Sequence, residues 1–497
     1  MTVTERTKEI KIGMLESTIA LSDRMSTSFG PKGLDKMIKK GKECTITNDG
    51  ATILKFFKEN PLHNILGSMS DAQDVNCGDG TTSVVLLACS LYKTMSEDDN
   101  IHSAKKAQAL EIVKKIGVDH IRSVRSKVND ILSVALTTLN SKIAAKNVKL
   151  AKIAIDALNS FNFEDVKILK KVGGNLDDVI MHKGIVLQQN RGFIGFEGIK
   201  TVKLLIVQFC ISAPKTNMDA KVEIKSIKQM KQLVLEEQEY LMKKIRKIKE
   251  SGCNLLVVQK SLVRESISKL ALHLFKKEGI DVIDGLERRE IEYLSNKMNI
   301  RAVSDPLLIK QATDIEVEVF KYEENSLMDD PSINSTFVNF KTDDCCTVEI
   351  SGVDQIVVDE CERSLHDVLC VVRCLKNEPF ICPGGCAIET GIGVKLEEYS
   401  GEQRLLVNKA ADGFLALTHH LAKSAGFNTI EIVNSLKMKL KENWNYGISM
   451  RRNRISDMVN MEHVVQPSAV CESEIVLAIE TVQMLLKIDD MLPTIEK

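Results

Sequence analysis

The chain has 497 residues, enough for roughly three domains of ordinary size, and a composition of 44% hydrophobic and 27% charged residues is typical of a globular protein. A formal net charge of −1 excludes the basic field of a nucleic-acid-binding protein, and an aromatic content of 4% argues against stacking platforms for single strands. Because the N-terminus has no apolar segment and no run of about 18 apolar residues occurs, we expect a soluble, cytoplasmic protein.

Thirteen cysteines are scattered along the chain, several of them within apolar helix or strand patterns. Zinc sites usually show CxxC pairs, whereas the densest set here has spacings of four, eight and four; its members are Cys370, Cys374, Cys382 and Cys386. We therefore expect reduced thiols that act as small apolar side chains.

The first third of the sequence is mainly helical. The periodicity predicts a helix over 8–28 and further helices from 53 to 130, with short strands near 37–38 and 45–47 between them. The turn signal Asn48-Asp49-Gly50 follows the second strand, and on its own it is better explained as structural than as functional.

One stretch in this part is a candidate for phosphate binding. Gly78, Asp79 and Gly80 predict a tight turn, three hydroxyl residues follow at 81–83, and then an apolar helical run begins. The free N–H groups at a helix start favour phosphate, but Asp79 would repel it unless a hard cation such as Mg²⁺ lies between them. A capped helix after a glycine turn is the alternative interpretation.

The middle of the chain alternates strands and helices, which indicates an α/β domain with parallel pairing. The expected strands are 204–209, 254–259, 281–284 and 302–303, and the expected helices are 261–277 and 288–296. The charged segment 221–250 has helical periodicity, and a projecting arm and a plain surface helix explain it equally well.

The last third is again helical, after β-like pieces at 346–350 and 355–358 and with turns expected near 445–447 and 465–467. The order helical, mixed, α/β, mixed, helical suggests nested domains in which both chain ends belong to one unit. Asp367 stands at an expected helix start, where local chemistry favours a capping residue over a group that orients water. The loop after Lys170 and Lys171 is a further, weak phosphate candidate.

Taken together, five stretches resemble the group II chaperonins in order and spacing, and the match extends over essentially the whole chain. They are Gly30–Met37, Thr47–Leu54, Gly78–Ser83, Ser364–Asp367 and Pro383–Gly385. Four more stretches narrow the resemblance to one type of subunit of the eukaryotic cytosolic chaperonin (TRiC/CCT); they are Ala72–Val75, Gln208–Asp219, Val464–Pro467 and Leu486–Asp490.

The resemblance implies a multidomain α+β chaperonin fold. Its parts would be a mostly helical equatorial ATP-binding domain (1–130 and 379–497), a small mixed intermediate hinge domain (131–195 and 346–378), and an α/β apical client-binding domain with a helical protrusion (196–345). Leu262, Ser266, Lys269, Leu270 and His273 would be candidate client contacts, although an amphipathic helix packed on its own sheet explains them as well.

The resemblance also implies an ATP-dependent chaperone whose ATP hydrolysis drives lid closure of a double-ring chamber. The implied cofactors are ATP and Mg²⁺, with K⁺ as an optional cation, and the implied partners are paralogous subunits (eight per ring), client proteins such as actin and tubulin, and prefoldin. The alternative is a scaffold subunit that binds ATP and hydrolyses little of it.

Carried over residue by residue, Asp367 would activate the attacking water and Asp49, the other catalytic residue, would lie near the γ-phosphate. Asp79 would hold the metal, and the nucleotide-binding residues would be Gly30, Pro31, Gly50, Gly78, Asp79, Gly80, Thr81, Thr82, Ser83, Lys171, Gly385 and Gln466. Two positions depart from the usual pattern, since Cys386 replaces the last glycine of a triple and Ser449 replaces an Asp or Asn.

Overall fold

The computed structural model describes residues 3–40, 43–57, 60–97, 101–142, 145, 147–189, 191–212, 226–261, 264–323 and 334–490. The chain forms two compact units. The first comprises Met1–Phe163, Gly174–Val179 and Ser351–Lys497, and the second comprises Glu164–Gly173 and Ile180–Ile350. The boundaries of the three expected domains stay a prediction.

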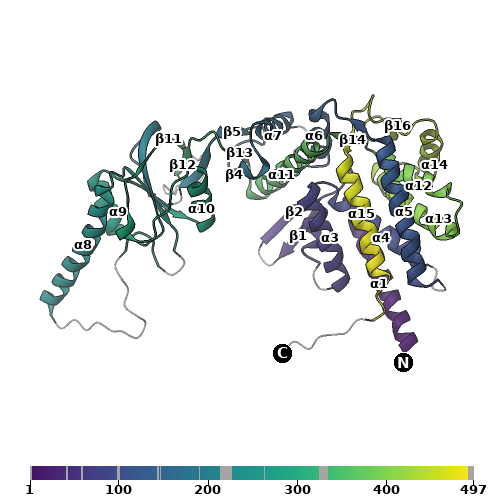
Figure 1. The fold of residues 1–497 in the computed structure, drawn as a ribbon, viewed down its shortest axis with the longest axis horizontal. Helices are drawn as coiled ribbons and strands as arrows, with labels where there is room; N and C mark the ends of the chain where they lie inside the picture. The colour runs from purple at the N-terminus through teal and green to yellow at the C-terminus, as the bar shows by residue number, and fades with distance from the viewer. Residues whose placement is uncertain are drawn as a thin grey trace. The chain divides into compact units, whose positions relative to one another are not determined.

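The first unit is built mainly from helices and contains both ends of the chain (Figure 1). Its helices are α1 (Val3–Ser26), α2 (Gly50–Leu54), α3 (Pro61–Cys77), α4 (Thr81–Ser96), α5 (Ser103–Val124), α6 (Ile131–Leu139), α7 (Val148–Ser160), α11 (Gln355–Asn377), α12 (Ala387–Glu397), α13 (Arg404–Ala425), α14 (Thr429–Leu440) and α15 (Ser468–Leu485).

The core of the first unit surrounds α4. Residues Val84–Leu91 of this helix are all buried, because α1, α3, α13 and α15 pack around it. A helix that is apolar on every side must be buried on every side. The apolar run after the predicted phosphate turn is therefore the central helix of this unit, and the turn that precedes it is fixed by the core.

Three small antiparallel sheets complete the first unit. The hairpin β1 (Lys36–Lys40) and β2 (Glu43–Thr47) agrees with the two predicted short strands. A second sheet has the order β17-β14-β3, and β15 pairs with β16; the bounds are β3 (Ser126–Lys127), β14 (Phe380–Pro383), β15 (Tyr446–Ser449), β16 (Arg454–Asp457) and β17 (Val465–Pro467). The turn expected at 465–467 is thus wrong, since this segment is strand β17, whose residues pair with β14.

Helix α11 corrects two further predictions. It begins at Gln355 with Asp354 as its N-cap, whose side chain accepts a hydrogen bond from the backbone N–H of Gln355 at 2.7 Å. The β-branched run at 356–358, expected as a strand, is the first turn of this helix, because the cap and the buried face of α11 outweigh strand propensity. Asp367 therefore lies within the helix and does not cap it.

The second unit contains a seven-stranded sheet of order β6-β12-β11-β8-β9-β10-β7 and a three-stranded sheet of order β4-β13-β5. The bounds are β4 (Val166–Val172), β5 (Ile180–Lys183), β6 (Ile185–Gln189), β7 (Arg191–Phe193), β8 (Gly198–Val207), β9 (Leu255–Gln259), β10 (Asp281–Leu286), β11 (Thr313–Glu323), β12 (Asn334–Phe340) and β13 (Cys346–Gly352). Within the described seven-stranded sheet the pairings β8–β9 and β9–β10 are parallel and the other pairings are antiparallel, so the predicted parallel sheet is part of a mixed sheet.

Helices α8 (Ile227–Glu250), α9 (Lys269–Glu278) and α10 (Arg288–Lys297) belong to the second unit, with one apolar cluster on each face of the large sheet. The helix expected at 261–277 begins only at Lys269, capped by Ser268, and the strand expected at 302–303 is reduced to a single bridge. Of the candidate client contacts, Leu262 lies outside the described residues.

The charged helix α8 is buried only near its C-terminal end, at Leu241, Ile245 and Ile248. Its N-terminal half extends from the sheet (Figure 1), and Ile227 and Met230 there are 77% and 58% exposed. The described part of the segment is therefore a projecting arm, whereas 221–225 lie outside the described residues.

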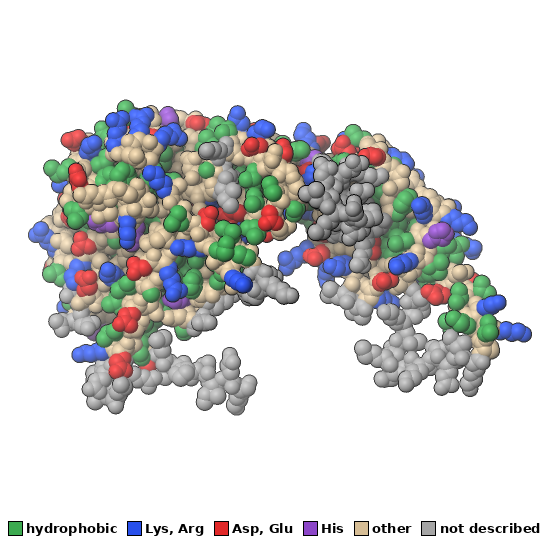
Figure 2. Space-filling view, turned by 180° about the vertical axis from the view of Figure 1, so that it is seen from behind, with side chains coloured by type: hydrophobic (Ala, Val, Ile, Leu, Met, Phe, Trp, Pro, Cys, Tyr) green, Lys and Arg blue, Asp and Glu red, His purple; other side chains and the backbone are tan. Residues whose placement is uncertain are grey.

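No helix in the described part of the chain is both long and apolar enough to cross a membrane. Figure 2 shows basic and acidic side chains interspersed over the visible face of each unit, as the near-neutral net charge predicts.

Candidate active site

A cavity of about 470 Å³ lies in the first unit, within the range of about 300–1,000 Å³ typical of small-molecule sites. Its walls come from the loop after α1, the turn between α3 and α4, the end of α6, the middle of α11 and the segments around β14, β15 and β17. The predicted site residues that line it are Gly30, Pro31, Asp49, Asp79, Gly80, Thr81, Thr82, Ser83, Asp367, Gly385 and Gln466.

The N-terminus of α4 forms one wall of the cavity. Its N-cap is Gly80, at φ +81, which supplies no side-chain cap, so the backbone N–H groups of the first turn are left for another acceptor. The turn before it is held by its own hydrogen bonds. Asp79 Oδ1 accepts from the backbone N–H of Gly80 at 2.7 Å, and Gln73 Nε2 donates to the carbonyl of Asp79 at 3.0 Å. This is the geometry of an anion site at a helix start.

Two of the predicted binding residues, Gly50 and Gly78, pack behind this wall. A Cβ on Gly50 would lie 2.9 Å from the backbone nitrogen of Thr82. A Cβ on Gly78, which has φ +75, would overlap the Cβ of Cys370 in α11. Both glycines let other segments approach the turn closely, so they fix its position.

Asp49 caps α2 and also faces the cavity. Its Oδ2 accepts hydrogen bonds from the backbone N–H and the hydroxyl of Thr52 at 3.0 and 2.7 Å, and its Oδ1 accepts from the hydroxyl of Thr81 at 2.8 Å. Burial raises the pKa of Asp49, but the charge of Lys142 and these hydrogen bonds outweigh it, and the pKa is lowered overall. Asp49 therefore stabilises the turn after β2, as expected, and is also part of the cavity wall.

Asp367 lines the cavity from α11, and its side chain is 10% exposed. Its Oδ2 forms an ion pair with the ammonium group of Lys142, which follows α6 and whose side chain is 7% exposed. An ammonium group beside a carboxylate favours its ionised form, which is the form that a general base requires. Sequence reasoning missed Lys142, since nothing in the residues around it marks a partner 225 positions later.

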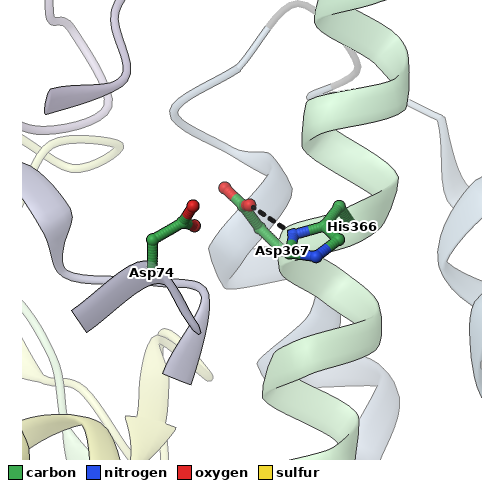
Figure 3. Close-up of side chains that lie close together, drawn as sticks. All are labelled: Asp74, His366 and Asp367. Atoms are coloured by element: carbon green, nitrogen blue, oxygen red, sulfur yellow. Dashed lines mark ion pairs between the residues drawn. The ribbon is translucent and has the colours of Figure 1, made fainter. Parts of the chain in front are cut away.

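Asp74, on α3, faces Asp367 (Figure 3), and one ligand atom from each of Asp74, His366 and Asp367 lies within 4.8 Å of the others. His366 Nδ1 is 3.7 Å from Asp367 Oδ1. Burial and the charge of Asp49 raise the pKa of Asp74. Since Lys142 already neutralises Asp367, we assign no metal to this cluster.

Another part of the cavity wall is formed where β14 leads into α12. Gly385 has φ +66, and a Cβ there would lie 3.0 Å from both the backbone nitrogen and oxygen of Ile448. Cys386, the next residue, also has positive φ, +56, as the N-cap of α12, which explains why a glycine is expected there. Gln466 Nε2 donates to Cys471 Sγ at 3.0 Å.

Lys171 belongs to the second unit, where it is an ion-pair partner of the buried Glu349 at 3.5 Å; His182 Nε2 lies 2.9 Å from the other oxygen of Glu349. The contact with nucleotide that is expected for Lys171 remains a prediction.

The cavity wall is acidic, and sequence reasoning missed half of its acidic residues. Lys32, Lys142 and Arg451 face a larger acidic set, namely Asp49, Asp79, Asp367, Glu389, Glu462 and Glu474. A polyphosphate therefore enters such a site only with cations that offset the combined negative charge. Asp79, next to the open end of α4, fits a Mg²⁺ ligand on this ground.

Comparisons with known proteins show the family of the chain. The sequence profile described as the TCP-1/cpn60 chaperonin family matches residues 21–496, so the chain belongs to that family and is a chaperonin subunit with the predicted multidomain α+β fold. Members of the family are generally ATPases that bind nucleotide.

Three similar proteins are each named T-complex protein 1 subunit delta. The chain is 41% identical to that of Encephalitozoon cuniculi over 496 residues (99% of each chain). It is 36% identical to that of Rattus norvegicus and 35% to that of Homo sapiens, each over 520 residues, 99% of this chain and 95% of the relative. The one type of subunit that the four stretches predicted is the delta subunit. The names of these relatives confirm that prediction.

Proposed function

We propose that this chain is an ATP-hydrolysing subunit of a hetero-oligomeric chaperonin, in which the cavity of the first unit binds ATP and Mg²⁺. The observation that carries the proposal is the convergence of an uncapped helix start (Gly80–Ser83), a carboxylate beside it (Asp79) and a second, charge-paired carboxylate (Asp367) on one cavity. Phosphoryl transfer to water needs these three functions.

In this proposal the N–H groups of the first turn of α4 hold the phosphates, and Asp79 holds Mg²⁺, which neutralises charge on the phosphate oxygens. Asp367 accepts a proton from the attacking water, with Lys142 keeping its carboxylate ionised and oriented. Asp49 holds the hydroxyl of Thr81 at 2.8 Å and so positions the start of α4.

The name of the relatives, T-complex protein 1 subunit delta, supports assembly with other chaperonin subunits. We propose paralogous subunits in a cytoplasmic double ring, eight per ring, with actin, tubulin and other unfolded proteins as clients and prefoldin as a delivery partner. Hydrolysis would drive lid closure by domain rotation. Native mass spectrometry tests the ring, since an active, stable monomer would contradict it.

The decisive experiment is Asp367→Asn in the full chain within its assembly. We expect hydrolysis by this subunit to fall at least about 100-fold, because the general base is lost, while ATP binding measured by equilibrium dialysis is kept. Asp359→Asn makes the same change two turns earlier on α11, at a side chain that hydrogen-bonds Gln355, and serves as the control.

The alternative, a scaffold subunit that binds ATP and hydrolyses little, is motivated by Cys386, which lines the cavity in place of a glycine. It predicts that the unmodified subunit and the Asp367→Asn variant hydrolyse ATP at the same low rate. Equal rates in the presence of normal ATP binding would therefore replace the main proposal by this one.

A further inference from the structure

Two glutamates in the cavity wall have no role in the proposed hydrolysis. Glu389 lies in the first turn of α12 and Glu474 lies in α15, and both line the cavity. Glu389 Oε2 and Glu474 Oε1 are buried and have no hydrogen-bond partner among the described residues. Glu474 as a whole is only 4% exposed. A buried polar atom without a partner requires an explanation, for which an ion is one physical candidate.

The other deeply buried acidic side chains described in the first unit all have a basic partner. Glu360 pairs with Arg363 at 2.7 Å, and Glu462 pairs with Arg452 at 3.0 Å. Asp367 pairs with Lys142. Glu474 is the exception in the described part of this unit, because its charged neighbours are the carboxyl groups of Glu389 and Asp79.

The other polar group that acts on Glu474 is the hydroxyl of Ser83, which is neutral and donates its proton to the carbonyl of Gly80. Two neighbouring buried carboxyl groups cannot both stay ionised unless positive charge is supplied. Burial accordingly raises the pKa of Glu474, with Glu389 as the next contribution, and burial raises the pKa of Glu389 as well. The missing positive charge must come from a proton or from a cation that reaches the cavity.

We propose that Glu389 and Glu474 form a cation site, separate from Asp79, that binds a hydrated divalent cation of the Mg²⁺ type. Both unpartnered atoms are carboxylate oxygens, which are the ligands of hard cations, and Mg²⁺ typically keeps several waters when it binds to one or two carboxylates. The cavity that both side chains line gives it access.

Asp79 does not complete this site. Among the described side chains, Asp79, Glu389 and Glu474 do not bring ligand atoms within 4.8 Å of one another, and Asp79 Oδ1 already accepts from the N–H of Gly80. The two cation sites are therefore distinct parts of one acidic wall. This inference concerns binding to the nucleotide-free chain, so it does not depend on the proposed hydrolysis.

The test uses Mn²⁺ as a paramagnetic probe for Mg²⁺ and the full-length, nucleotide-free protein. Free Mn²⁺ is measured by electron paramagnetic resonance during a titration. We expect binding that is weakened at least about 10-fold in Glu474→Gln and in Glu389→Gln, each of which replaces a carboxylate by an amide of the same shape. Glu397→Gln is the matched control, because it makes the same change two turns later on α12 at a side chain that is 43% exposed and pairs with Lys437, and we expect it to keep this binding.

A second readout shows whether loss of binding reflects loss of fold. Mn²⁺ should raise the midpoint of thermal unfolding of the unmodified protein and of Glu397→Gln, but not of the Glu389→Gln and Glu474→Gln variants. The proposal is overturned if the unmodified protein binds no Mn²⁺, which would show that the glutamates share a proton, or if Asp79→Asn abolishes binding and Glu474→Gln keeps it.

Discussion

The ammonium group of Lys142 is ion-paired with the carboxylate of Asp367, and both side chains are almost fully buried. Lys142 also lowers the pKa of Asp49, so one cation serves two carboxylates that line the same cavity. Asp49 follows β2 and Asp367 lies on α11, and this lysine, which follows α6, places positive charge beside both.

Replacing Lys142 by Met should therefore affect stability and catalysis together. Breaking a buried pair leaves an uncompensated charge, which costs about 3–5 kcal/mol of unfolding free energy, and we expect hydrolysis to fall with it. Lys55→Met is the control, since Lys55 pairs with Asp71 at 3.4 Å with both side chains about half exposed, and such pairs are worth about 0–1 kcal/mol. Urea unfolding measures the stability of both variants, and an ATPase assay measures their activity. Equal stability of the two variants would contradict the role assigned to Lys142.

Gly78→Ala should destabilise the protein by about 2 kcal/mol more than Gly426→Ala. Both glycines have positive φ, +75 and +81, so both substitutions cost about 1 kcal/mol in backbone strain. Only at Gly78 would the new Cβ overlap Cys370, whereas nothing lies within 4 Å at Gly426. The difference in unfolding free energy measures how closely α11 packs against the phosphate turn. Thermal unfolding of the two variants measures this difference.

The same cysteine-to-valine change should have different effects at two buried positions. Cys386→Val puts a β-branched residue at φ +56, which we expect to cost about 2 kcal/mol more than Cys382→Val in strand β14, where branching is favoured. Unfolding in urea provides the comparison. Equal losses of unfolding free energy would mean that overpacking, and not backbone conformation, determines the cost of valine at position 386.

Asp49 predicts a pH dependence of stability. Because its pKa is lowered in the folded state, it contributes stability above its unfolded pKa, and this is lost as pH falls through the folded pKa. Asp49→Asn, which keeps a capping side chain, should be about 2 kcal/mol less stable at neutral pH, and the gap should close below about pH 4. Urea unfolding at several pH values measures this gap, and a gap that stays constant into acid would contradict the argument.

The sequence predicted what local pattern determines. The apolar run after Ser83 identified a buried helix, and the glycines beside Asp79 identified the turn that precedes it. The sequence-based prediction misplaced the start of α11. The β-branched residues at 356–358 favour a strand locally, while Asp354 and tertiary packing favour a helix. Lys142 and Glu474 carried no local signal, since each matters only through groups brought close by folding. The predicted roles of the site residues remain predictions.

The division of the chain has a consequence for its synthesis. The second unit is almost continuous in sequence, between Glu164 and Ile350, so a ribosome translates all of it before the C-terminal part of the first unit, which begins at Ser351. The cavity, in contrast, needs Gln466 and Glu474 near the end of the chain as well as Gly30 near its start. The N-terminal helices of the first unit therefore have an incomplete core until the C-terminal helices that pack on them have been translated.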